Sequence, residues 1–232
     1  MAKVGIIGAM DVEVELIREQ LEELRVEMRG RLEFNIGLLE GVPVVVAMCG
    51  DGKVNAALCA HTLIHQYGVT HVINTGIAGA LDKRLSIGDF VVSTDTVEHD
   101  MDVTGLGYAP GQNPFLDTLA FPADSRMRKL AMEVMREVVP NALVCEGRIA
   151  TGDQFICTEE AKNRIVDQFG AACCEMEGAA IAHACYLAGV PYVVIRAISD
   201  DANSSSAVDF PTFKEQTSHL GADVVRAMVA RL

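Results

Sequence analysis

The chain has 232 residues, half of which are hydrophobic, and its formal net charge is −13. A chain this acidic is a poor partner for the phosphates of nucleic acids and for anionic membrane surfaces, so we expect it to bind neither. Its seven cysteines show no C-x-x-C spacing, which argues against a zinc ribbon or a thioredoxin-type site and indicates free thiols in the reducing cytoplasm.

The first half of the chain alternates between strand-like and helix-like segments. Residues 3–10 are typical of a short apolar strand and not of a signal peptide, and no apolar run approaches the roughly 18 residues of a membrane span. Residues 11–27 show helical periodicity, because apolar side chains recur on one face. The segments that follow are predicted as a hairpin over 31–50, a helix over 53–66, a strand over 69–76 and an extended stretch over 87–103.

The second half of the chain continues the alternation after a loop over residues 105–123 that is rich in Gly and Pro. The predicted elements are a helix over 124–138, a strand and its exit over 142–156, helices over 158–168 and 175–189, a strand over 190–198, and a last helix with Pro211 in its first turn. Because strands alternate with helices throughout, we predict one α/β domain over residues 1–232, a three-layer sandwich with a central mixed sheet flanked by helices.

Three short motifs suggest cofactor or metal sites but do not fit them. "GIIGAM" lacks the third glycine of the dinucleotide-binding fingerprint, and "GDGK" lacks the early glycine and the Ser or Thr of a phosphate-binding loop. "HDMD" at residues 99–102 holds possible metal ligands, but a polar extended segment near a subunit contact is the better interpretation. We therefore expect no cofactor and no metal ion.

Polar groups gather at the exits of the predicted strands, where ligands bind in open α/β sheets. The exits carry Glu13, "NTGIAG" at 74–79, "TGDQFI" at 151–156, "CEMEGAA" at 174–180 and "RAISDD" at 196–201. Each has an ordinary explanation by itself. Glu13 suits the first turn of a helix, Asp200 suits an N-cap, and carboxylates are common at a helix start. Five polar strand exits in one sheet favour a common ligand-binding site over five unrelated structural roles.

The motifs resemble, in order and over essentially the whole chain, the bacterial 5'-methylthioadenosine/S-adenosylhomocysteine nucleosidase family of the purine nucleoside phosphorylase superfamily. They are "GIIGAMDVEVELI", "NTGIAGAL", "GDFVVS", "HDMDVT", "TGDQFI", "CEMEGAAIAH" and "RAISDDA". "EMEGAA" and "RAISD" are the most specific, and "GIIGAM" followed by an acidic residue separates this family from its relatives. The resemblance implies a partly barrel-like sheet, a homodimer, and hydrolysis of the N-glycosidic bond of adenine thionucleosides in methionine salvage.

The resemblance also implies roles for the acidic residues. Asp200 matches the acid that protonates adenine N7, Ser199 its hydrogen-bonding neighbour, and Arg196 a nearby polar anchor. Glu13 matches the carboxylate that positions and deprotonates the attacking water. A proton on N7 makes adenine a better leaving group, and a carboxylate near the other face stabilises the cationic sugar and orients water. Burial favours the protonated form of a carboxyl group, so environment alone can divide the two roles.

Other matching positions are expected to hold the sugar and the base. Glu177 matches the carboxylate that binds the ribose hydroxyls, and Met176 lies under the sugar. Phe155 matches the ring that stacks on adenine, and the backbone of Ile156 reads the edge of the base. Gly79 lies in the turn that lets the backbone approach the substrate.

Three further positions concern the ends of the pocket and the partner subunit. Phe210 matches an aromatic residue that closes the pocket, while Leu106 and Pro114 match a loop that reaches over the alkylthio group of the neighbouring subunit.

The chain departs from the family's usual pattern at several of these places. Ile77 replaces a serine near the water and the ribose, Ala80 replaces a glycine, and Leu106 replaces a frequent aromatic. Asp51 stands where an apolar residue is common. The change at Ile77 removes a hydrogen bond of about 0.5–1.5 kcal/mol. We therefore expect a working enzyme whose rate or substrate preference is altered.

Alternatives remain open at this point. The base pocket also suits a sister nucleosidase for another adenosine derivative, of the futalosine type or 5'-deoxyadenosine. A purine nucleoside phosphorylase would need cations for its anion, whereas the loop after the first strand offers Asp11, Glu13 and Glu15 and no arginine before Arg18. A nucleoside-binding or regulatory protein without turnover is the third alternative, and the presence of both Glu13 and Asp200 argues against it.

Overall fold

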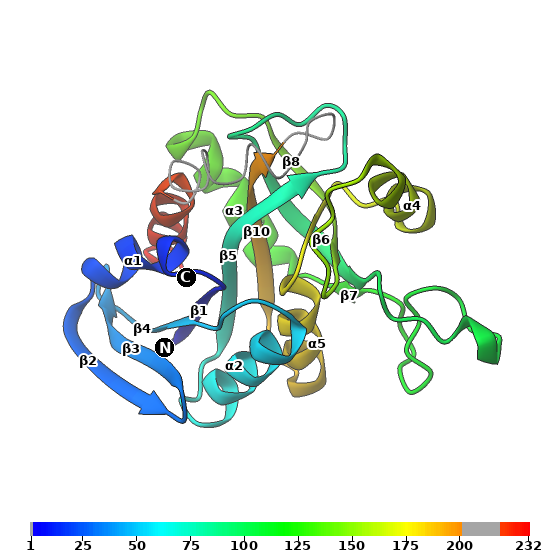
Figure 1. Cartoon of the computed structure of the whole chain (residues 1–232). Coiled ribbons are helices and arrows are strands. Elements are labelled where there is room, and N and C mark those ends of the chain that lie inside the picture. The colour runs from blue at the N-terminus through cyan, green and yellow to red at the C-terminus, as the bar shows by residue number, and fades with distance from the viewer. Residues whose placement is uncertain (1, 201–218) are drawn as a thin grey trace.

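A computed structural model describes residues 2–200 and 219–232, and a single mixed sheet runs through this part of the chain (Figure 1). The strands are β1 (Val4–Gly8), β2 (Glu22–Arg29), β3 (Leu32–Leu39), β4 (Val42–Met48), β5 (His71–Ala80), β6 (Phe90–Glu98), β7 (Phe121–Pro122), β8 (Val144–Thr151), β9 (Cys173–Glu175) and β10 (Tyr192–Asp200). The helices are α1 (Asp11–Glu19), α2 (Lys53–His65), α3 (Ser125–Val138), α4 (Glu159–Phe169), α5 (Gly178–Ala188), a 3-10 turn (Thr104–Leu106) and a C-terminal helix over 219–229.

The sheet curls into a partial barrel. Its strand order is β10-β6-β8-β9-β5-β1-β4-β3-β2, and β10 also pairs with β5, so that five strands close on themselves. β1, β4, β3 and β2 extend the sheet outward from this ring, and parallel and antiparallel pairs are mixed. The predicted mixed, partly barrel-like sheet is confirmed.

Helices cover both faces of the sheet, because its central strands are apolar on both sides. β1 is buried along its whole length, and β10 is buried at every position, as expected for strands inside a three-layer fold. One core lies between the sheet and the pair α2 and α5, where Leu63 and Ile181 are buried. The other lies under α1, α3 and the C-terminal helix, where Ile17, Met127 and Val225 are buried.

The predicted helix over residues 11–27 is wrong beyond Glu19. The chain leaves α1 at Gln20, and residues 22–29 form β2, which pairs antiparallel with β3. The physical reason is a second periodicity in the same residues: Leu24, Val26 and Met28 alternate with polar residues, as in a strand. The backbone groups of β2 find partners in β3, which decides between the two patterns.

Smaller corrections concern the segments around the site. The helix predicted over 175–189 begins only at Gly178, because residues 173–175 form β9. The predicted loop over 105–123 contains the end of the 3-10 turn and the short strand β7. Pro211, expected in the last helix, lies outside the described residues. Within the described part of the chain, no helix is both long and apolar enough to cross a membrane.

The strand pairing brings the predicted strand exits together. β1, β5 and β10 run parallel side by side, so their carboxyl ends point the same way. β8 and β9 are parallel neighbours, and β9 runs antiparallel to β5, where Cys174 pairs with Gly79. The residues that follow these strands therefore surround a common space, which holds the candidate site.

Candidate active site

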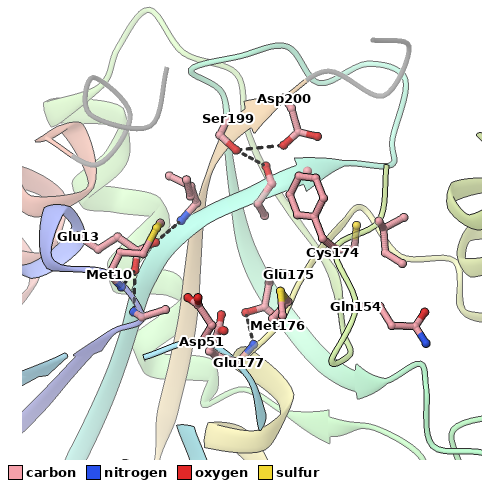
Figure 2. A pocket seen from close by; sticks show the side chains of 16 residues that line it. Met10, Glu13, Asp51, Gln154, Cys174, Glu175, Met176, Glu177, Ser199 and Asp200 are labelled. Carbon is pink, nitrogen blue, oxygen red and sulfur yellow. Dashed lines mark hydrogen bonds between the residues drawn. The ribbon is translucent and has the colours of Figure 1, made fainter. Parts of the chain in front are cut away.

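A cavity of about 430 Å³ opens at these strand exits (Figure 2). Nine of the residues singled out in the sequence line it: Glu13, Ile77, Gly79, Phe155, Ile156, Met176, Glu177, Ser199 and Asp200. Glu13 and Asp200 thus face one cavity although they lie 187 positions apart in the sequence (200 minus 13). The fold brings together most of the groups that the sequence motifs suggested.

Four predicted residues lie elsewhere or outside the described chain. Arg196 is buried behind the cavity and does not line it. Leu106 and Pro114 belong to the segment between β6 and β7, which extends away from the sheet (Figure 1). Phe210 lies outside the described residues, so its predicted place in the pocket has no structural description.

Glu13 is held in place by backbone donors at the start of α1. Its Oε2 accepts hydrogen bonds from the N–H groups of Ala9 at 2.7 Å and Met10 at 3.0 Å, and its Oε1 accepts one from Ile77 at 3.0 Å. These N–H groups come from the exit of β1 and from β5. A Cβ on Gly76 would approach Oε1 within 2.7 Å, so a glycine there makes room for the carboxylate. The first turn of a helix also favours a negative charge.

Burial and hydrogen bonding act in opposite directions on this carboxyl group. Glu13 is only 4% exposed, and burial raises its pKa. The positive charge of Arg196 and the three backbone N–H groups oppose that shift. A carboxyl group with a raised pKa is a better proton acceptor at neutral pH than an ordinary glutamate, which suits a general base.

Asp200 ends β10 at an irregularity in the strand. The register against β5 shifts between Ile198 and Asp200, so that Asp200 pairs with Gly79. A Cβ on Gly79 would approach Asp200 Oδ2 within 2.9 Å, so a side chain at this position would displace the carboxyl group. The hydroxyl of Ser199 lies 3.1 Å from Asp200 Oδ1 and 3.4 Å from the carbonyl oxygen of Ala78. Asp200 is buried, and it also lines the cavity.

Glu175 is a lining residue to which the sequence analysis gave no role. It pairs with the buried guanidinium of Arg196, which also donates to Asn74 Oδ1 at 2.6 Å. Glu175 further accepts from the Thr151 hydroxyl and, at 2.7 Å, from the N–H of Gly178 at the start of α5. Arg196 is thus a positioning residue, which holds the Glu175 carboxylate from behind the cavity wall. The available signal was the position of Glu175 at the end of a strand, next to the predicted sugar-binding pair Met176 and Glu177.

Glu177 shares the cavity with Glu175 and receives fewer hydrogen bonds. Its Oε1 accepts from the N–H of Gly52 at 2.7 Å, which ties the loop after β4 to this side chain. Burial, followed by the negative charge of Glu175, raises the pKa of Glu177 to about 8. Because Arg196 is bonded to Glu175 and not to Glu177, we place the negative charge of this pair on Glu175.

Glu177→Gln is expected to change how stability depends on pH. The folded protein holds a proton on Glu177 up to about pH 8, whereas the unfolded chain releases it near 4.5. The free energy of unfolding therefore falls as pH rises through this window, by about 2–4 kcal/mol from this group. The amide keeps an oxygen for Gly52 and carries no charge. Thermal melts from pH 5 to 8 should show a variant that gains stability relative to wild type as pH rises, and parallel curves would contradict this.

The rest of the cavity wall is mainly apolar. Phe155 is 51% exposed and lies with the buried Ile156 in the segment after β8. Cys174 also lines the cavity, but burial, with a smaller effect from Asp200, raises its thiol pKa to about 12. A thiol that stays protonated is a poor nucleophile, so we expect the carboxyl groups, and not Cys174, to take part in catalysis.

No metal centre is suggested by the described residues. Among them, no group of three or more His, Cys, Asp or Glu side chains is placed to hold an ion. Asp100 of the "HDMD" motif pairs instead with Lys53 at 2.6 Å, and its other oxygen accepts from the N–H of Asp153 at 2.8 Å. This motif therefore braces the start of α2 against the exit of β8.

Sequence comparisons show which family the chain belongs to. The sequence model of the phosphorylase superfamily matches residues 3–230. The chain is 43% identical over 232 residues to the 5'-methylthioadenosine/S-adenosylhomocysteine nucleosidase of Exiguobacterium sp., covering 99% of this chain and 98% of that protein. It is 38% identical over 234 residues to the enzyme of the same name from Bacillus subtilis, covering 99% of each.

Solved structures show the same architecture. The nucleosidase of Neisseria meningitidis, in complex with methylthio-immucillin-A, matches with a TM-score of 0.96 and 38% identity over 100% of both chains. The native futalosine hydrolase of Helicobacter pylori matches with a TM-score of 0.94 and 34% identity over 100% of this chain and 98% of that one. The chain therefore belongs to the phosphorylase superfamily and, within it, to the 5'-methylthioadenosine/S-adenosylhomocysteine nucleosidase family of N-glycosyl hydrolases.

Proposed function

We propose that this enzyme hydrolyses the N-glycosidic bond of 5'-methylthioadenosine and S-adenosylhomocysteine, releasing adenine and the 5-thioribose product. The observation that carries the proposal is the common cavity of Glu13, Glu177 and Asp200. Three carboxyl groups with different environments line one space, as a reaction with a leaving base, a cationic sugar and an incoming water requires. The products fit a cytoplasmic role in methionine salvage.

Asp200 is the proposed acid. With adenine stacked on Phe155 and its edge at the backbone of Ile156, N7 lies toward Asp200, which donates its proton as the bond from C1' to N9 breaks. Ser199 supports this step whichever form Asp200 takes, because a hydroxyl both donates and accepts. Gly79 allows the base to approach, since a side chain at that position would collide with the carboxyl group.

Glu13 is the proposed base. As adenine leaves, the sugar resembles an oxocarbenium ion, and the Glu13 carboxylate both stabilises that charge and takes a proton from the attacking water. Its three backbone donors hold it in position without using a flexible side chain. Glu177 binds the ribose hydroxyls beside Met176.

Water is favoured over phosphate as the nucleophile by the charge of the cavity. Glu13, Asp51 and Glu175 line it besides Glu177, which is protonated at neutral pH, and no Arg or Lys does so among the described residues. The Arg196 guanidinium is buried behind the wall and bonded to Glu175 and Asn74. A phosphate beside the ribose would meet like charge without a paired cation.

The test of the proposal is release of free base in the absence of phosphate. Purified protein is mixed with 5'-methylthioadenosine, S-adenosylhomocysteine, adenosine, inosine and futalosine, and the free base is followed by chromatography. Release of adenine from the two thionucleosides supports the proposal. Release from futalosine alone would identify the sister activity of the Helicobacter pylori structure. Release only when phosphate is added, with ribose 1-phosphates as products, would identify a phosphorylase.

Ile77→Ser is expected to raise turnover by about two- to tenfold, the value of one hydrogen bond. Ile77 lines the cavity, and its backbone N–H already holds Glu13. A serine adds a hydroxyl beside the water and leaves that N–H in place. Ile77→Ala controls for the lost volume. Steady-state kinetics with both thionucleosides measure the effect, and an unchanged rate and preference in the serine variant would overturn this role for Ile77.

We also propose that the enzyme is a homodimer through α2 and α5. Between these helices lies a groove of about 670 Å³, and Val54, Leu58 and Leu187 are exposed along it. The segment between β6 and β7 extends from the body and carries Leu106 and Phe115, which are 76% and 96% exposed (Figure 1). A second copy would cover both surfaces and bring Leu106 toward the neighbouring cavity.

Light scattering coupled to size exclusion tests the dimer. Leu58→Glu places a charge in the groove and should convert the dimer into a monomer. Leu143→Glu is the control, because Leu143 is also exposed, at 47%, but does not line the groove. A wild-type monomer, or a Leu58→Glu dimer as stable as wild type, would contradict the proposal.

A further inference from the structure

Asp51 differs from the other carboxyl groups that line the cavity. Glu13 accepts three backbone hydrogen bonds, Glu175 pairs with Arg196, Glu177 accepts from Gly52, and Asp200 accepts from Ser199. Within residues 2–200 and 219–232, no hydrogen bond or ion pair engages the side chain of Asp51. It is an exposed residue of the wall, so it lies where the cavity opens to solvent.

The backbone around Asp51 is nevertheless braced on both sides. The N–H of Gly50 donates to the carbonyl oxygen of Ala9 at 3.1 Å, and the N–H of Gly52 donates to Glu177 at 2.7 Å. Lys53 follows and donates its N–H to Asp153 at 2.8 Å. Both glycines have positive φ, which favours glycine and fixes the course of the loop. The fold thus presents the Asp51 carboxylate beside the sugar-binding residue.

The place of Asp51 in the cavity indicates which part of a substrate it meets. Figure 2 shows Asp51 beside Glu177, at the end of the cavity away from Asp200. The substituent on C5' is the end of a nucleoside that lies away from its base. With the base at Asp200 and the ribose at Glu177, we therefore assign this substituent to the end of the cavity at Asp51. This assignment rests on the proposed function.

We propose that Asp51 selects adenosine derivatives whose 5' substituent carries a hydrogen-bond donor, a hydroxyl or an ammonium group. An ionised carboxylate at this place accepts from such a group and gains a charge-assisted hydrogen bond. It gains nothing from a methylthio group, which has no donor and displaces water from the carboxylate. Asp51 is then a specificity residue for the 5' end and takes no part in breaking the glycosidic bond.

The experiment compares substrates that differ only at C5'. The value of kcat/KM for adenine release is measured with 5'-methylthioadenosine, adenosine, and 5'-(2-aminoethylthio)-5'-deoxyadenosine. Each is tested on wild type, Asp51→Asn and Asp51→Leu. Asp167→Leu is the matched control, because it removes a carboxylate from an exposed position of α4 that does not line the cavity. Turnover of 5'-methylthioadenosine reports that each variant is folded.

The ratio of each donor substrate to 5'-methylthioadenosine should fall about tenfold or more in Asp51→Leu and stay unchanged in Asp167→Leu. If the ratio falls only for the aminoethylthio substrate, and falls as far in Asp51→Asn as in Asp51→Leu, the group that Asp51 recognises is an ammonium group. If the ratio falls only for adenosine, and is partly retained in Asp51→Asn, the group that Asp51 recognises is a hydroxyl. Ratios unchanged by Asp51→Leu overturn the inference and leave the proposed function standing. No adenine from any substrate with wild type overturns both.

Discussion

Asp200→Asn is expected to abolish adenine release, with a loss of about 10²–10⁴-fold or more in kcat. The amide has nearly the shape of the carboxyl group but cannot give a proton to N7, and general acid catalysis contributes on this scale. Ser199 still finds an acceptor in the amide oxygen, so the local hydrogen bonds survive. Single-turnover measurement of free adenine from 5'-methylthioadenosine gives the result directly.

The controls for this variant concern folding and binding. Asp200 is buried next to Gly79, so a shape change there would disturb β5 and β10, and a thermal melt must match wild type closely. Substrate binding should persist, because the base and sugar contacts come from other residues. Adenine release near the wild-type rate from a folded Asp200→Asn protein would remove Asp200 from the role of acid.

Glu13→Gln is expected to cost orders of magnitude in rate and little in substrate affinity. The amide cannot accept the proton of the attacking water, and it carries no charge to stabilise the sugar. Pre-steady-state kinetics separate the chemical step from binding. A large loss of affinity with an unchanged chemical step would contradict the role of Glu13 with water.

The Glu13 variant also has a structural cost that must be measured. Three N–H groups converge on the two carboxylate oxygens, and an amide supplies only one oxygen to accept them. At least one buried donor then loses its partner, which destabilises the protein by about 1–3 kcal/mol. Activity is therefore compared at a temperature well below both melting points.

The sequence predicts this fold well where a segment has one clear periodicity. β1 and the first part of β10, residues 192–195, are apolar runs, and both strands have a pairing partner on each side. The segment over 22–29 fits a helix and a strand equally well, and only its pairing with β3 decides the outcome. The choice between helix and strand thus depends on a pairing partner outside the segment, which the local residue pattern does not reveal.

For the candidate site, too, the sequence predicts some features, while others depend on contacts that form only in the folded chain. The strand exits locate Glu13 and Asp200, because parallel strands end at one edge of a sheet. Arg196 is predicted as a polar anchor for the substrate, but it does not line the cavity, since its long side chain turns inward toward Glu175, which the sequence does not show. In the sequence, Asp51 stands out only as an unusual residue. Its place beside Glu177 follows from the hydrogen bond between the Gly52 N–H and Glu177, which the sequence does not show.

The claim at the centre of this account is that Glu13 and Asp200 act on opposite sides of one bound nucleoside. A crystal structure with an adenosine analogue whose base is joined to the sugar by a carbon–carbon bond tests it most directly, because the analogue is not cleaved. The account predicts the Asp200 carboxyl group within hydrogen-bond distance of N7 and a water held by Glu13 against C1'. A base turned away from Asp200, or a Glu13 carboxylate with no water between it and C1', would contradict it.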